Sequence, residues 1–192
     1  MLDKKEIDQI KRRVAGYLRE GVIIKSEKKK FVNFFIKNAD ISLDSAKLLF
    51  KVSTDDKLKD HLGFPDFNGF LWVINSSYYS MFYLVRALLE SEGITIKSDS
   101  SVHSITFDAL IYFYYGKLQK ELIEAFAEAK EEAAEILGKE KAKGLIEDYF
   151  YEKKKRAKFT YEIGAIAMMN KAQTSLIRAK KFREEIRKIV WS

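Results

Sequence analysis

The sequence predicts an all-α protein, built as an antiparallel up-and-down bundle of four to six helices. Three observations favour this class. Nearly every segment repeats its apolar residues every three or four positions, as one face of a helix does. No segment shows the alternation of apolar and polar residues typical of a half-buried strand. The only proline of the 192 residues is Pro65, and no Pro-, Gly- or Ser-rich linker divides the chain, so we expect a single core.

The first expected element is a basic amphipathic helix within residues 1–25. Such a helix can dock on its own bundle, lie on a membrane surface or bind a partner. Its apolar stripe contains no Trp or Phe, and we expect it to pack on the bundle formed by residues 26–192. The stripe consists of Ile7, Ile10, Val14 and Tyr17.

Two long helices are expected next, separated by a loop. The first begins near Ser26, a residue suited to capping a helix, and runs to about Val52. Residues 54–67, which include Pro65, are expected to form the loop. The second helix, residues 68–92, carries apolar side chains on more than one face, so we expect it to lie at the centre of the bundle.

The remainder of the chain also has helical periodicity. Residues 118–137 form a Glu-rich pattern typical of an outer, solvated helix, and Gly138 is expected to end it. Gly164 weakens the pattern further along the chain. The expected helices are residues 102–115, 118–137, 140–160 and 170–190.

Composition excludes several chemistries. The chain has no cysteine, which removes disulfides, thiolate metal sites and cysteine nucleophiles. No apolar run approaches the roughly 20 residues of a membrane span, and the first residues lack the apolar core of a signal peptide, so we expect a cytoplasmic protein. Phosphate-binding glycine loops are missing, and Glu147–Asp148 lacks the Glu-x-x-His of di-iron bundles. We therefore expect no metal and no cofactor.

The charge balance favours a polyanionic partner. The chain has 35 Lys and Arg against 28 Asp and Glu, a net charge of +7. An excess of cations raises the rate of encounter with RNA. The many Lys and Glu residues, together with a single Pro and no Cys, are also typical of thermophilic proteins, whose surfaces carry many charges of both signs.

Several segments, in order, resemble one family. Residues 77–89, SYYSMFYLVRALL, followed by Gly93, resemble the YYAMFYAARALL…G helix of prokaryotic HEPN domains. Val102-His103-Ser104 stands where many such proteins have K-x-H-S, and residues 156–161, RAKFTY, stand in the place of R-x-x-A-D-Y. The helix before them, with Asn38-Ala39 and Ser45-Ala46-Lys47, resembles the opening helix of the family. The resemblance covers about residues 31–187.

The resemblance implies a HEPN-like bundle that forms a homodimer and binds RNA or nucleotides across the dimer cleft. Such domains often belong to toxin–antitoxin or defence modules and act beside a minimal nucleotidyltransferase. Many are metal-independent endoribonucleases with an R-x(4–6)-H motif, in which a basic side chain takes a proton from the 2′-hydroxyl and Arg stabilises the phosphate. Here Arg156 fits the motif, but Tyr161 stands in place of its histidine. A tyrosine with a pKa near 10 is a poor base at neutral pH, so nuclease activity is weak or absent unless His103 supplies an imidazole.

The candidate site residues each have a plainer interpretation. The cations around Arg156 can contact phosphates, although a charge run on a helix is usually a solvated face. Arg86, in an apolar helix, must either extend to water or find a carboxylate or phosphate partner. The alternative function is a non-enzymatic partner of a nucleotidyltransferase, with an exposed apolar patch. The predicted catalytic residues are Arg156, Tyr161 and His103, and the predicted nucleic-acid contacts are Arg86, Lys153, Lys154, Lys155 and Lys158.

Overall fold

The computed structural model describes residues 3–27, 29–97, 101–150 and 158–191. Within them the chain forms seven helices and two three-residue strands, which confirms the all-α bundle. The elements are α1 (Lys4–Arg19), β1 (Ile23–Lys25), α2 (Val32–Thr54), α3 (Asp56–Leu62), α4 (Phe70–Ser91), β2 (Ile94–Ile96), α5 (Val102–Tyr114), α6 (Lys120–Phe150) and α7 (Lys158–Val190). None of the described helices is long and apolar enough to cross a membrane.

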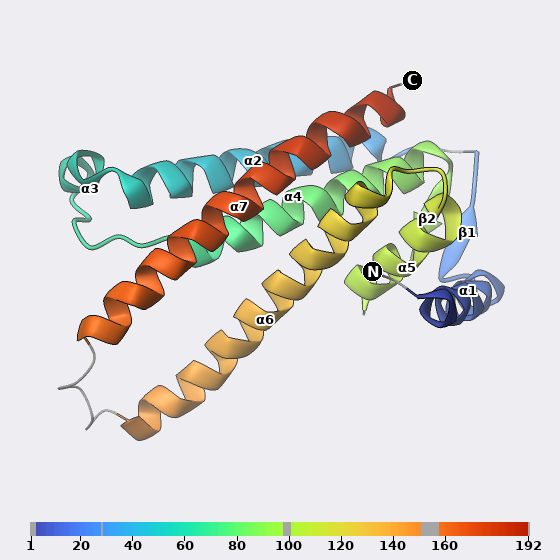
Figure 1. Ribbon diagram of the computed structural model, residues 1–192. Helices are drawn as coiled ribbons and strands as arrows, with labels where there is room; N and C mark the ends of the chain where they lie inside the picture. Colours follow the sequence, from blue (N-terminus) through green and yellow to red (C-terminus); the bar gives the residue numbers. More distant parts are fainter. Residues whose placement is uncertain (1–2, 28, 98–100, 151–157, 192) are drawn as a thin grey trace.

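Helix α4 is the centre of the bundle, as its apolar pattern predicts. It packs against α2 and α7 along much of its length and also contacts α6 and α5 (Figure 1). Met81, Leu84 and Val85 of α4 are fully buried. Small residues such as Ala87 on α4 and Ala179 on α7 are also fully buried, which lets neighbouring helices pack closely against them. The polar face of α4 is therefore reduced to a narrow stripe, and this stripe carries the candidate site.

The small sheet is a feature that the sequence pattern did not predict. Strand β1 pairs antiparallel with β2, with Ile23 opposite Ile96 and Lys25 opposite Ile94. The pairing continues one residue further, where the Ser26 amide donates to the Gly93 carbonyl at 2.8 Å. The helix expected from Ser26 begins only at Val32, because Ile23–Ser26 pair with Gly93–Ile96 just after α4. Three residues are too few to show the alternation by which a strand is recognised.

Helix α1 packs against α5 at one end of the molecule, away from α7 (Figure 1). Ile10 and Val14 on its inner face are buried. Arg13 adds a bidentate ion pair with Asp108 of α5, with Nε–Oδ2 and Nη2–Oδ1 distances of 2.7 and 2.8 Å. Apolar burial and a charge-assisted pair together fix α1 to the bundle.

Three further boundaries differ from the expectation. The expected loop contains α3, which the Asp55 side chain caps by accepting from the Leu58 amide and which Gly63 ends in the left-handed conformation. Helix α6 continues through Gly138, since one interior glycine costs only about 1 kcal/mol relative to alanine. Helix α7 begins at Lys158 rather than near residue 170 and likewise continues through Gly164.

Candidate functional site

Arg86 lies half-buried on the partly exposed stripe of α4, and no carboxylate among the described residues pairs with it. Its guanidinium carbon is 4.7 Å from the centroid of the Phe35 ring, and its Nη2 approaches the carbonyl of Ile96 at 3.4 Å. Burial lowers the pKa of Arg86, although the Glu90 carboxylate and Tyr83 oppose this effect. No described carboxylate forms an ion pair with Arg86. A half-buried guanidinium in this setting is favourable for an anionic ligand.

Glu90, one turn further along α4, accepts hydrogen bonds from groups other than Arg86. It is only 2% exposed, and its carboxylate accepts from the Thr95 hydroxyl at 2.8 Å and from the Phe31 amide at 3.3 Å. These bonds hold the start of α2 and strand β2 against α4. Glu90 therefore has a structural role, and it moderates the positive potential at Arg86 without neutralising it by contact.

His103 lies in the first turn of α5, with its ring against three aromatic rings of α4. The ring centroids of Phe82, Tyr79 and Tyr78 are 4.3, 5.5 and 5.6 Å from that of His103. Its Nδ1 is 2.8 Å from the Tyr78 hydroxyl. Burial, Lys130 and Arg86, in that order, lower the pKa of His103, so the imidazole is neutral at neutral pH.

The Tyr78 contact fixes what the imidazole can do. Burial and the neighbouring Tyr79 raise the pKa of Tyr78, so its hydroxyl stays protonated. If this hydroxyl donates to Nδ1, the imidazole proton is on Nε2, which can then donate to a ligand oxygen. In the other tautomer, Nδ1 donates to Tyr78 and the Nε2 lone pair is free to accept a proton. The first arrangement suits binding and the second suits a general base.

Lys130 of α6 is a site residue that sequence reasoning missed. Its ammonium nitrogen is 4.9 Å from the ring centroid of Phe107, one helical turn from His103. Because both Lys130 and Arg86 lower the pKa of His103, the imidazole lies in a positive potential supplied by two helices. A signal was present: Lys130 is a cation within the Glu-rich pattern of residues 118–137. The pattern indicated a solvated face, and tertiary packing turns this lysine toward α5.

Aromatic rings connect these polar groups into one surface. Tyr79 and Tyr83 are half-buried on α4, with ring centroids 6.2 Å apart. Tyr83 stacks at 6.4 Å on Phe35, the ring beneath Arg86. Partly exposed rings beside cations can stack on nucleobases while the cations neutralise phosphate. We call this the Arg86–His103 surface; it comprises Phe35, Tyr79, Tyr83, Arg86, His103 and Lys130.

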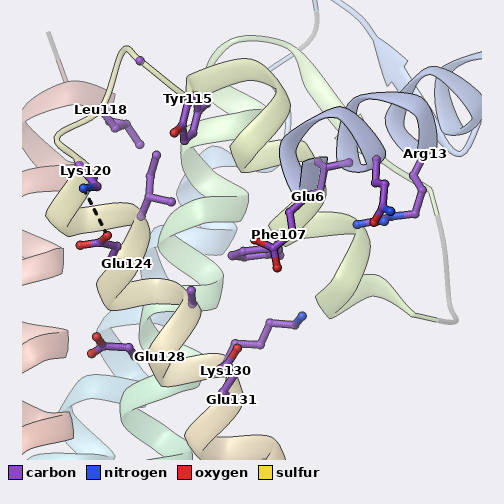
Figure 2. Close-up of a pocket in the computed structure, with 15 residues that line it drawn as sticks. Glu6, Arg13, Phe107, Tyr115, Leu118, Lys120, Glu124, Glu128, Lys130 and Glu131 are labelled. Atoms are coloured by element: carbon purple, nitrogen blue, oxygen red, sulfur yellow. Dashed lines mark ion pairs between the residues drawn. The ribbon is translucent and has the colours of Figure 1, made fainter. Parts of the chain in front are cut away.

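A cleft of about 810 Å³ lies beside this surface, between α1, α5 and α6 (Figure 2). Lys130 and Phe107 belong to its lining. The other lining cations are already paired, Arg13 with Asp108 and Lys120 with Glu124 at 3.8 Å. Four glutamates also line it: Glu6, Glu124, Glu128 and Glu131. The cleft therefore suits a polyanion less well than the Arg86–His103 surface does.

The structure brings together two of the predicted site residues, Arg86 and His103. The other predicted residues Arg156 and Lys153–Lys155 lie outside the described residues. The structure therefore does not place them relative to His103. Lys158 and Tyr161 belong to the start of α7, but their side chains lie outside the described part. Among the described residues, no group of His, Asp or Glu side chains is arranged to hold a metal ion.

Comparisons with protein-family models, with curated proteins and with solved structures give no match to this chain. The class is therefore defined by the fold and the site alone. The protein is a helical bundle in which Arg86 and two half-buried tyrosines of the central helix α4 lie beside a neutral histidine of α5. Among the described residues Arg86 has no ion-pair partner.

Proposed function

We propose that this protein binds RNA or nucleotides through the Arg86–His103 surface, as a HEPN-type homodimer. The observation that carries the proposal is Arg86, a half-buried guanidinium without an ion-pair partner among the described residues, on a surface where cations and tyrosines converge. Cations such as Arg86 can neutralise the phosphates of a nucleotide, and tyrosine rings can stack on its bases. The net charge of +7 favours the same class of ligand.

A neutral imidazole beside two cations adds a specific function to this surface. A phosphate bound at Arg86 would reverse the local potential and raise the pKa of His103. The imidazole would then gain a proton and a second donor as the ligand binds. This coupling distinguishes His103 from a purely structural histidine.

RNA cleavage is the further activity that the resemblance to HEPN nucleases suggests. It would rest on Arg156, with His103 or Tyr161 as the proton acceptor and without a metal. We place this protein in a toxin–antitoxin or defence module, with weak or no such activity, because a tyrosine takes the place of the motif histidine.

The alternative function is a scaffold that engages a minimal nucleotidyltransferase and binds no RNA. The observation in its favour is the set of large apolar side chains exposed on α2, α3 and α4. Such a set marks an interaction surface when its members are contiguous. Absence of RNA binding together with capture of a purified nucleotidyltransferase would favour this alternative.

Binding is tested with a fluorescent single-stranded RNA of mixed sequence, followed by anisotropy. We expect Arg86→Gln and Lys130→Gln each to weaken binding about tenfold, since each removes a phosphate contact worth about 1 kcal/mol or more. Lys181→Gln, on α7, is the control that loses the same charge elsewhere. Equal affinities for all four proteins, or no binding by the wild type, would overturn the proposal. Thermal unfolding of each variant checks that the Phe35–Arg86 contact is not needed for folding.

Cleavage is tested separately, with the same RNA in the presence of a metal chelator. Products formed by the wild type and lost in both Arg156→Ala and His103→Asn would establish a metal-independent nuclease. Products lost only in Arg156→Ala would leave Tyr161 as the acceptor, which Tyr161→Phe would then test. No products from the wild type would restrict the function to binding.

A further inference from the structure

Helix α2 carries an apolar stripe that no described part of the chain covers. Phe34, Ile41 and Leu48 are 56%, 53% and 63% exposed and follow one another at seven-residue intervals. Seven residues are close to two helical turns, so the three side chains lie on one line. The opposite face of α2 packs on α4, and Asp40 faces α7 through its ion pairs with Arg183 and Arg187. The stripe therefore faces solvent in the isolated chain.

The polar residues within the stripe are suited to burial. Asn38 donates from Nδ2 to the Phe34 carbonyl at 2.7 Å, and Ser45 donates from Oγ to the Ile41 carbonyl at 2.8 Å. Both side chains are thus bonded to their own helix. A neighbouring helix could cover them with little of the penalty that unpaired polar groups incur. The stripe is continuous from Phe34 to Leu48, a length of about 21 Å.

The charges beside the stripe are self-complementary. Lys37 lies four residues before Ile41 and Asp44 lies three residues after it, and both are exposed. In a parallel pair of α2 helices, this flank would face the other flank of the second copy, where Asn38 and Ser45 lie and no charge complements Lys37 or Asp44. In an antiparallel pair centred on Ile41, Lys37 meets Asp44 of the second copy twice, and Phe34 meets Leu48. Asp44 already accepts from Lys47 at 2.8 Å but remains 72% exposed, so it is accessible to a second cation.

We propose that the stripe is the contact between two copies of this chain, with their α2 helices antiparallel about a twofold axis at Ile41. The inference rests on the homodimer in the proposed function but does not depend on RNA binding. A contact of this length is smaller than a standard interface, so the dimer is weak and forms in the micromolar range. It does connect with the site, because Phe34 packs edge-on against Phe35, 5.4 Å away, which supports Arg86.

Sedimentation equilibrium from about 1 µM to about 1 mM protein tests the surface. Ile41→Asp buries a charge at the axis, and we expect it to weaken the dimer at least about 100-fold. Ile177→Asp on α7 is a matched control, because Ile177 is also exposed, at 58%, and lies outside the stripe. A wild type that is monomeric throughout the range overturns both this inference and the homodimer. A dimer unaffected by Ile41→Asp overturns the inference alone.

The antiparallel register has its own test. Lys37→Glu and Asp44→Lys should each weaken the dimer about tenfold by placing like charges opposite each other, and the double variant should restore it. Because the chain has no cysteine, Ile41→Cys introduces a unique thiol near the axis. Oxidation should link two copies through position 41, whereas Ile177→Cys should stay unlinked. A dimer that needs Ile41 but ignores both charge changes and the introduced thiol would overturn the register.

Discussion

Gly93 shows how one residue can join two elements. It follows α4 with a φ of +72°, and a Cβ built on it would be 1.9 Å from the Ser26 carbonyl oxygen. The left-handed backbone strains any other residue, and here the neighbour is backbone that cannot rotate away. The sequence marked Gly93 as a helix end, but its close approach to Ser26 depends on the β1–β2 pairing, which the pattern does not show.

Gly93→Ala is expected to lower the free energy of unfolding by about 3 kcal/mol, from backbone strain and loss of the Ser26 contact. Gly116→Ala is the matched control: its φ is +89° but a Cβ there meets nothing within 4 Å, so only strain of about 1 kcal/mol applies. Gly16→Ala, inside α1 with open space, should instead stabilise by about 0.5–1 kcal/mol. Urea denaturation checks all three. Equal losses for Gly93→Ala and Gly116→Ala would contradict the close contact.

His103 should make stability depend on pH. Its pKa in the folded state is lowered from 6.5, first by burial and then by Lys130 and Arg86. The unfolded chain therefore binds more protons as pH falls through 6.5, and the free energy of unfolding should fall below that pH. His103→Asn, which keeps a polar atom near Nδ1, should flatten the profile between pH 5 and 7. His61→Gln, at the other histidine, should retain the slope; urea midpoints across this range decide between them.

Helix α1 lies before residues 31–187, the segment that resembles HEPN domains, and the buried carboxylate of Asp108 holds it on the bundle. Asp108 is 4% exposed, and both of its carboxylate oxygens accept hydrogen bonds from Arg13. The Arg13 side chain is 47% exposed. Removing Arg13 would leave a buried carboxylate without its cation, which is costly.

We expect Arg13→Ala to destabilise the protein by about 2 kcal/mol, a value reduced from that of a fully buried pair because Arg13 is half exposed. Arg13→Lys should recover only part of the loss, since an ammonium cannot form the bidentate contact. Arg12→Ala, at the exposed neighbouring position, is the control and should change stability little. Thermal denaturation at low and high salt measures these effects, and equal losses in Arg12→Ala and Arg13→Ala would contradict the role of the ion pair.

The helices could be predicted from the sequence where an apolar periodicity extends over many residues. Elements that form only through tertiary contacts could not be predicted. The apolar run Phe70–Leu89 predicted the limits of α4 to within about two residues, and the helical periodicity after residue 101 did the same for α5. Strands β1 and β2 were missed because pairing, rather than local pattern, creates them. In the site, Arg86 was marked by its charge in an apolar helix, and His103 by its motif. Their convergence with Lys130 required the packing of α4, α5 and α6, which one sequence does not contain.

At the scale of the whole molecule, the core is continuous from α1 to α7. Ile10 and Val14 of α1 belong to the same buried cluster as Leu88 of α4 and Ile186 of α7. A cluster without internal boundaries implies that the chain unfolds as one cooperative unit rather than by early loss of α1.

Val14→Ala tests this continuity, because Val14 is fully buried and lies far along the chain from α7. The loss of two methyl groups and the cavity left behind should cost about 2 kcal/mol and lower the Tm of the entire protein by about 4 °C or more. Far-UV circular dichroism and the fluorescence of Trp72 and Trp191, on α4 and just after α7, should report the same midpoint. If α1 were a separate unit, the variant would leave the tryptophan midpoint unchanged and lower only an early helical transition. The two probes would then diverge, and α1 would act as an appendage of the bundle instead of a part of its core.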